Sequence, residues 1–200
     1  MGEIIKISVI IPVKNCEETI GFQIIALLNQ STTIPYEIII SDNGSIDNTK
    51  VVIEDYLRIN KNIKYLYSGE RKGVSYARNK GAEIAYGDVL LFCDGDDIVE
   101  REWIEEMYQG SLNFDMWGGS LDDKILNRNK NRPAGKPLFM SELPLFGKTP
   151  FIVGANFGIK RNILEALGGW NEEYDFGSCD DVELTWKGMV NGYVIGFCQK

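Results

Sequence analysis

Histidine is missing from the 200-residue sequence, so neither a histidine general base nor a histidine metal ligand is available within these residues. The four cysteines are scattered and form no Cys-x-x-Cys pair, which gives little support to a zinc site and is typical of a reducing compartment. The 29 acidic residues outnumber the 21 lysines and arginines, and the net charge of −8 argues against a nucleic-acid partner.

Long hydrophobic runs are absent as well, and the N-terminus lacks the charged and then apolar pattern of a signal peptide. We therefore expect a cytoplasmic protein with no transmembrane segment in this stretch, and peripheral association with the inner face of the membrane stays open. The 44% hydrophobic and 25% charged residues are typical of a soluble globular protein. The length is enough for a single domain with a sizeable core.

Strand-like and helix-like patterns alternate through the first half of the chain. Apolar or alternating runs predict strands at residues 4–12, 36–41, 63–67 and 89–93. Pro12 is expected to close the first strand, because proline cannot donate to a ladder. Helices are predicted at residues 17–30, at 73–86, and from the turn at 42–45 to residue 59. This alternation predicts an α/β fold with a mostly parallel, Rossmann-like central sheet and helices on both faces.

The second half is less regular. Helices are predicted at residues 100–110, 162–167 and 180–189, and strands at 114–121, 151–159 and 193–198. Residues 122–150 show no period and hold four prolines and a basic run. Such a segment is usually functional or mobile, and an ordinary surface loop is the alternative. The chain stops directly after the last predicted strand, so we expect it to be cut short at this end.

An acidic cluster, Asp94-Gly95-Asp96-Asp97, follows the apolar run at residues 89–93. Open α/β sheets bind ligands at the carboxyl ends of their strands. Asp94 and Asp96, separated by a glycine, can offer oxygen ligands to one divalent cation such as Mg²⁺ or Mn²⁺. An acidic surface turn is an equally good interpretation of the cluster taken alone.

Two further polar motifs fall where the predicted elements meet. Asp42 and Asn43 offer acceptors to a nucleobase or to ribose hydroxyls, although an Asx turn is favoured for this pair alone. Gly73 permits close backbone approach at a helix start, and Arg78 in the same helix favours an anion such as a diphosphate. An ordinary surface arginine is the alternative.

Acidic and aromatic residues gather near the start of the predicted helix at 180–189. Asp180 and Asp181 either complement the helix dipole or supply a general base. Trp170, Tyr174 and Phe176 precede this pair and suit the apolar face of a sugar, with core packing as the equal alternative.

The order of these motifs resembles that of the family 2 glycosyltransferases. The matching segments are residues 8–15, 41–47, 73–81, 92–97, 154–156, 167–172 and 180–184. This resemblance covers essentially the whole chain and is specific for the family, not for the sugar. It implies the A-type glycosyltransferase fold in a single catalytic domain, in which residues 1–97 bind the nucleotide-sugar and residues 98–200 bind the acceptor.

The resemblance also implies ligands and residue roles. The donor is a nucleotide-diphosphate-sugar, often a UDP-sugar, the cofactor is Mn²⁺ or Mg²⁺, and the acceptor is a glycan, a lipid-linked compound or another hydroxyl. Asp96 and Asp94 are implied as metal residues, and Asp181, with Asp180 beside it, as catalytic. Trp170 and Asn156 are implied on the acceptor side. The residues implied along the donor are Pro12, Val13, Lys14, Asp42, Asn43, Gly73, Arg78, Asp94 and Gly95.

The expected activity is metal-dependent, inverting transfer in cell-surface polysaccharide or glycoconjugate synthesis, with residues 122–150 closing over donor or acceptor. A retaining transferase, a non-catalytic nucleotide-sugar or glycan-binding domain and a nucleotidyltransferase are the alternatives. The chain departs from the family pattern at Asn43, where a second aspartate is usual, and at Cys179, where glycine is common. The Gln-x-x-Arg-Trp motif of polymerising members is absent, which favours addition of a single sugar. A histidine metal ligand found in some relatives would lie beyond Lys200.

Overall fold

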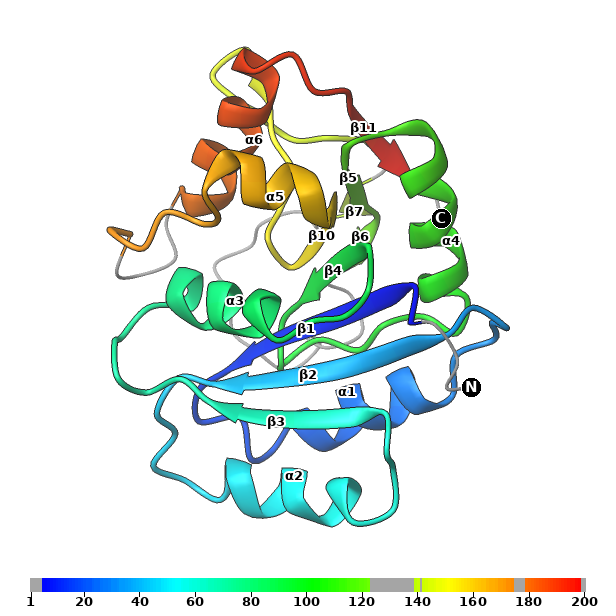
Figure 1. The fold of residues 1–200 in the computed structure, drawn as a ribbon, viewed down its shortest axis with the longest axis vertical. Helices are drawn as coiled ribbons and strands as arrows, with labels where there is room; N and C mark the ends of the chain where they lie inside the picture. The colour runs from blue at the N-terminus through cyan, green and yellow to red at the C-terminus, as the bar shows by residue number, and fades with distance from the viewer. Residues whose placement is uncertain (1–4, 123–138, 141, 175–178, 199–200) are drawn as a thin grey trace.

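The computed structural model describes residues 5–122, 139–140, 142–174 and 179–198. Its centre is a seven-stranded sheet with the strand order β11-β5-β10-β4-β1-β2-β3 (Figure 1). Every neighbouring pair is parallel except those of β10, which runs antiparallel to both β4 and β5. The predicted α/β fold with a mostly parallel sheet is confirmed. The strands are β1 (Ile7–Val13), β2 (Tyr36–Asp42), β3 (Ile63–Tyr67), β4 (Val89–Cys93), β5 (Met116–Gly119), β10 (Asn156–Lys160) and β11 (Ile195–Cys198).

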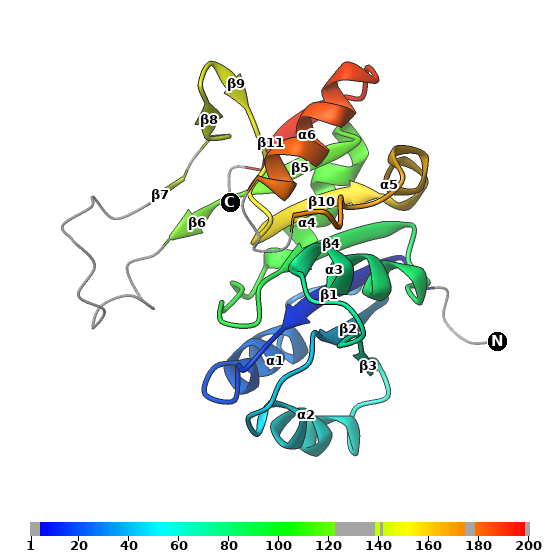
Figure 2. The ribbon, with the colours of Figure 1, turned by 90° about the vertical axis from the view of Figure 1, so that its left-hand side faces the viewer.

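Helices cover both faces of this sheet, because its central strands are apolar on both sides. Val9 and Ile11 of β1 pack in a cluster with α1 (Ile20–Leu28), α2 (Thr49–Leu57) and α4 (Trp103–Asn113). Ile10, between them, points to the other face and packs with α5 (Arg161–Leu167) and α6 (Asp180–Val190). The helix α3 (Val74–Glu83) lies on this second face (Figures 1 and 2).

Pro12 lies inside β1, opposite Ser41, so the prediction that it closes the strand is wrong. The carbonyl of Val13 accepts a hydrogen bond on the β2 side, from the Asn43 N–H. Pro12, one residue earlier, is therefore directed to the β4 side, where pairing with β1 has already ended at Ile10. The missing N–H of the proline consequently removes no ladder bond.

The predicted strand at residues 151–159 forms only in its second part, as β10. Upstream of β10 the backbone N–H groups bond outside the sheet: Ile152 donates to the Thr185 hydroxyl, and Gly154 donates to the Asp181 carboxylate. Side chains of α6 thus replace a ladder partner here. Likewise, the strand predicted at 114–121 is β5 followed by a separate short strand, β6 (Leu121–Asp122).

The irregular stretch at 122–150 is described in part. Its basic run and most of the predicted lid lie outside the described residues, as does Phe176. Among the described residues, β6 pairs with β7 (Phe139–Met140), and β8 (Leu145–Phe146) pairs with β9 (Thr149–Pro150) in two small antiparallel sheets.

Candidate functional site

The predicted site residues gather where the strand order changes direction, between β1 and β4. From β1 the chain winds outward to β2 and β3, and β4 then returns to the other side of β1. Open α/β sheets bind their ligands at the carboxyl ends of the strands that flank such a point. Asp42 ends β2 and Asp94 follows β4, so both lie at this edge.

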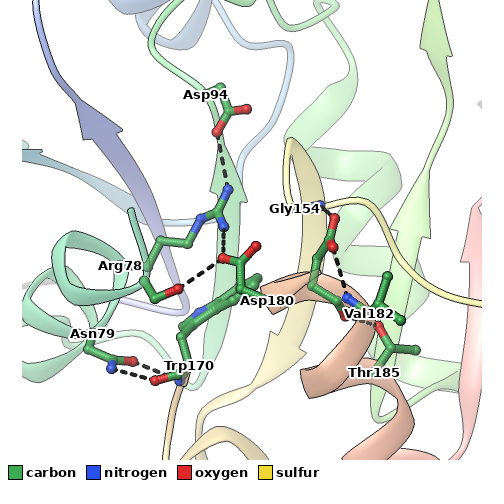
Figure 3. Close-up of polar contacts among 10 residues, drawn as sticks. Arg78, Asn79, Asp94, Gly154, Trp170, Asp180, Val182 and Thr185 are labelled. Atoms are coloured by element: carbon green, nitrogen blue, oxygen red, sulfur yellow. Dashed lines mark hydrogen bonds and ion pairs between the residues drawn. The ribbon is translucent and has the colours of Figure 1, made fainter. Parts of the chain in front are cut away.

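Arg78 connects three segments at this edge. Its guanidinium donates to Asp180 at 2.9 Å and to Asp94 at 3.3 Å (Figure 3). The Ser75 hydroxyl, also from α3, donates to Asp180 at 3.0 Å. Arg78 is 4% exposed, which excludes the alternative of an ordinary surface arginine. Arg78 thereby holds the acidic loop, residues 94–97, against the start of α6. The two aspartates that it contacts, Asp94 and Asp180, are 86 residues apart in the chain.

Trp170 belongs to the core. It is 1% exposed and packs edge-on against Phe92, and the Arg78 guanidinium lies over its ring at 4.5 Å from the centroid. A ring buried in this way cannot stack on an acceptor sugar, so the predicted acceptor role is wrong and the core-packing alternative is correct. The ring instead supports the guanidinium by a cation–π contact.

Asn156 is a second correction on the acceptor side. The side-chain carbonyl of Asn156 accepts from the Trp103 indole N–H at 3.0 Å, and its amide donates to the Ser120 carbonyl at 2.9 Å. The residue is buried, and these bonds use both ends of its carboxamide for joining α4 to β10 and to the end of β5. No acceptor contact from this side chain is consistent with that arrangement.

Asp180 and Asp181 differ in environment although they are neighbours. Asp180 is buried, and its Oδ2 receives both the Arg78 and the Ser75 bonds, so the structure makes it an anchor and contradicts a catalytic role. Asp181 is half-buried, and its carboxylate accepts from the backbone N–H groups of Gly154 and Val182. Burial, reinforced by the charge of Asp180, raises the pKa of Asp181. The raised pKa makes the Asp181 carboxylate a better proton acceptor than an ordinary aspartate.

Cys179 stands at the N-cap of α6 with φ of 73°, in the left-handed region. This conformation explains physically why glycine suits the position. We expect Cys179→Gly to raise the free energy of unfolding by about 0.5–1 kcal/mol, because glycine adopts this region without a Cβ clash. Urea denaturation measures the change. Cys179→Ala, which keeps the Cβ, is the control and should give no gain; an equal gain from alanine would contradict the conformational explanation.

The acidic loop is shaped by contacts with β1 and α1. Gly95 is packed so closely that a Cβ there would lie 2.7 Å from the Val13 side chain, and its carbonyl accepts from the Thr19 hydroxyl. Asp96 is exposed at the edge, and Asp94 is half-buried. Burial, together with the charges of Asp94 and Asp96, raises the pKa of Asp97 to about 7. These carboxylates thus lie close enough to repel one another, a conflict that a bound cation relieves.

Two carboxylates and phosphate oxygens are a normal ligand set for Mg²⁺, which keeps several waters. Within the described ranges there is no group of three or more acidic or sulfur side chains that could hold a metal by itself. Asp94 and Asp96 therefore suit a cation that a phosphate also coordinates. Their assignment as metal ligands stays a prediction.

The turn after β2 is held by hydrogen bonds to other residues of the protein. Asp42 accepts from the Ser45 N–H and from the Tyr65 hydroxyl, which agrees with the Asx-turn alternative. Asn43 is 6% exposed and makes three bonds to residues 68–73, so its predicted role in donor binding is wrong as far as its side chain is concerned. Pro12, Val13 and Lys14 lie beside this turn at the end of β1 and past it, where Lys14 is exposed.

Ser75, Gly154 and Tyr65 also belong to this network. Ser75 and Gly154 lie in segments that resemble the family, but no individual role is predicted from the sequence for any of the three. The reason is that each acts through a partner more than twenty residues away. Across the part of the chain that the structure describes, we find no helix with the length and apolar character needed to cross a membrane.

Comparison with known proteins is consistent with this geometry. Residues 8–168 match the model of the family described as Glycosyl transferase family 2. The chain is 35% identical over 199 residues to the glycosyltransferase AglE of Haloferax volcanii, covering 96% of this chain and 64% of that protein. It is 33% identical over 169 residues to the cholesterol galactosyltransferase of Borreliella burgdorferi, covering 81% of this chain and 46% of that protein. The chain therefore spans about half to two thirds of these relatives.

Among solved structures, TarS 1-349 of S. aureus in complex with UDP-GlcNAc superposes with a TM-score of 0.75 at 20% identity. The superposition covers 98% of this chain and 56% of that one. At this identity the likeness concerns the fold alone.

Proposed function

Because this chain belongs to glycosyl transferase family 2, we propose that it transfers a sugar from a UDP-sugar to an acceptor hydroxyl, with a divalent cation and with inversion at the anomeric carbon. The observation that carries the proposal is the Arg78 bridge. It joins the acidic loop, which suits a diphosphate and its cation, to the helix that presents Asp181. The residues proposed to bind the donor and the proposed base thus lie at one edge of the sheet.

The leaving group of such a reaction is a nucleoside diphosphate, whose negative charge grows as the glycosidic bond breaks. Arg78 is the positive group built into this edge, and its buried Nε–H has no partner among the described residues. Positioned cations and N–H donors stabilise developing charge strongly in a site from which water is excluded. Mn²⁺ or Mg²⁺ held by Asp96 and Asp94 would supply further charge compensation at the diphosphate.

Asp181 is the proposed general base. Its carboxylate would take the proton of the acceptor hydroxyl as the oxygen attacks the anomeric carbon on the face opposite the leaving group. Its hydrogen bonds to Gly154 and Val182 fix the carboxylate in orientation. An α-linked donor would then give a β-glycoside, and NMR of the product measures this configuration. The similarity to the glycosyltransferase AglE and to TarS in complex with UDP-GlcNAc supports a nucleotide-sugar donor. Cell-surface polysaccharide or glycoconjugate synthesis stays a prediction, and the acceptor stays open.

Asp96→Ala tests the donor side of the proposal. We expect this variant to lose Mn²⁺-dependent UDP affinity by about 100-fold, which corresponds to ~2.7 kcal/mol, because a carboxylate ligand of the cation is removed. Calorimetric titration of UDP with and without Mn²⁺ measures the loss. Asp55→Ala on α2, an exposed carboxylate, is the matched control. Unchanged, Mn²⁺-dependent UDP affinity in Asp96→Ala would refute the assignment of Asp96.

A further inference from the structure

Asn43 makes a set of hydrogen bonds that an aspartate cannot make. Its side-chain amide donates to the carbonyls of Ser68, at 2.7 Å, and Arg71, at 2.8 Å. Its side-chain oxygen accepts from the Gly73 N–H at 2.9 Å. Two acceptors face the nitrogen and one donor faces the oxygen, so the partners themselves define which end of the carboxamide is which. A carboxylate here would place negative oxygen against two carbonyls.

The segment fixed by these bonds, residues 68–73, leads directly into α3. It connects β3 to α3 and rises beside the C-terminal end of β2 (Figure 1). Gly73 is the N-cap of α3 with φ of 133°, and its carbonyl accepts from the Ala77 N–H. The start of the helix that carries Ser75 and Arg78 is thus bonded to the end of β2 through Asn43.

The same segment is also tied on its outer side. The Arg71 guanidinium donates to the carboxylate of Glu172 at 2.9 Å and to its carbonyl at 2.7 Å. Asn79 of α3 donates to the other oxygen of the Glu172 carboxylate and to the Trp170 carbonyl. Residues 68–73 are therefore bonded to Asn43 on one side and to Glu172 on the other. Through Asn79 and Trp170, the contacts of Glu172 reach the residues packed around Arg78.

We propose that Asn43 is a positioning residue: through residues 68–73 it fixes the start of α3, and so the Arg78 guanidinium against Asp180 and Asp94. It does not read the nucleobase, because its three polar contacts are used inside the protein. The ligand in this proposal, a nucleoside diphosphate, rests on the proposed function. The structural part rests on the hydrogen bonds of Asn43 alone.

The decisive variant is Asn43→Asp, compared with the wild type at about pH 8 and about pH 5.5. As a carboxylate, residue 43 loses both donors, and we expect UDP affinity in the presence of Mn²⁺ to fall at least about tenfold. Burial against the Ser68 and Arg71 carbonyls should raise the pKa of a carboxyl at this position above about 5.5. At the lower pH the carboxylic acid then regains one O–H donor, so the ratio to wild type should recover to within about threefold. The ionisable groups near this amide are Asp42 on β2, Tyr65 on β3, and Glu70, Arg71 and Lys72 on the segment itself. Expressing each affinity as a ratio to wild type cancels their own titration.

Two further measurements separate positioning from base reading. Loss of positioning should weaken UDP, GDP and ADP by the same factor, whereas loss of a base contact would weaken UDP selectively and overturn the proposal. Asn43→Ala removes the bonds without adding charge, so its loss should be the same at both pH values. Asn113→Asp, on the exposed end of α4, is the control for the added charge. Wild-type UDP affinity in Asn43→Ala would also overturn the proposal, and this variant decides the matter if Asn43→Asp does not fold.

Thermal unfolding without ligand keeps this test independent of the proposed function. We expect Asn43→Asp to unfold at least about 5 °C below wild type at the higher pH, with a smaller difference at the lower pH. If the wild-type protein does not bind UDP, the proposed function fails while this unfolding difference still tests the bonds of Asn43. If UDP binds and no difference is found, the positioning role fails and the proposed function stands.

Discussion

Replacing Asp181 by asparagine is expected to lower the rate of sugar transfer by about 10²- to 10⁴-fold, the range that a positioned general base contributes. An amide cannot take the proton of the acceptor hydroxyl. Donor binding should survive, because the Asp181 carboxylate accepts its hydrogen bonds from Gly154 and Val182 and not from the acidic loop. We therefore expect UDP affinity to stay within about threefold of wild type, so the effect falls on turnover.

The wild-type rate should also report the environment of Asp181. The base must be ionised to act, and burial raises the pKa of this carboxyl. The rate should therefore fall, as the pH is lowered, through a midpoint above the value of about 3.9 that is usual for aspartate. The free energy of unfolding changes with pH in the opposite direction to the rate. Because the pKa of this carboxyl is raised in the folded state, its contribution to stability falls as the pH rises above its pKa in the unfolded state.

Asparagine is not a perfect mimic at position 181. Both carboxylate oxygens accept from backbone N–H groups, of Gly154 and Val182, and the amide can serve only one of them. A fall in UDP affinity would therefore indicate that the loop around Gly154 has moved. Asp55→Asn on the exposed face of α2 changes the charge equally and should leave transfer unchanged. Normal turnover in Asp181→Asn, measured as UDP released in the presence of acceptor, would refute the base assignment.

The first half of the fold was predictable because its strands are local and apolar. Each strand from β1 to β4 is a short, mostly apolar run followed by a helical period, and a parallel order follows from that alternation. The direction of β10 was not predictable, because an apolar run carries no sign of whether its neighbour is parallel. Residues 151–155 have a strand-like pattern, which does not reveal that the N–H groups of Ile152 and Gly154 bond to Thr185 and Asp181, about thirty residues later.

The sequence predicts that the acidic and small residues at strand ends lie together at one edge of the sheet, and the structure has them there. What they bind stays a prediction. Side chains that look alike in the sequence then received different roles from burial: Asp180 is anchored and Asp181 is half-exposed, although both begin the same helix. Asn43 and Trp170 have the composition of ligand-binding residues, but contacts with distant segments use their polar and aromatic groups internally.

Removing the Arg78 guanidinium is the change with the largest expected effect on stability. In Arg78→Ala, Asp180 would stay buried with the Ser75 hydroxyl as its remaining partner. Breaking a buried ion pair from one side typically costs about 3–5 kcal/mol, because a charge is left without compensation in a poorly polarisable environment. The free energy of unfolding from urea denaturation should fall by this amount. Arg58→Ala, which breaks an exposed pair with Asp55, should change it by less than about 1 kcal/mol.

A loss of that size can approach the whole stability of a domain, which is about 5–15 kcal/mol, so a second variant is needed. Arg78→Ala combined with Asp180→Ala removes the stranded charge together with its partner. If the pair is coupled as the 2.9 Å contact indicates, the double variant should be more stable than the sum of the two single losses predicts, by about 0.5–3 kcal/mol. Strict additivity of the two losses would mean that Arg78 stabilises the fold through Trp170 and Asp94 instead. The contact between Arg78 and Asp180 would then contribute no measurable stability.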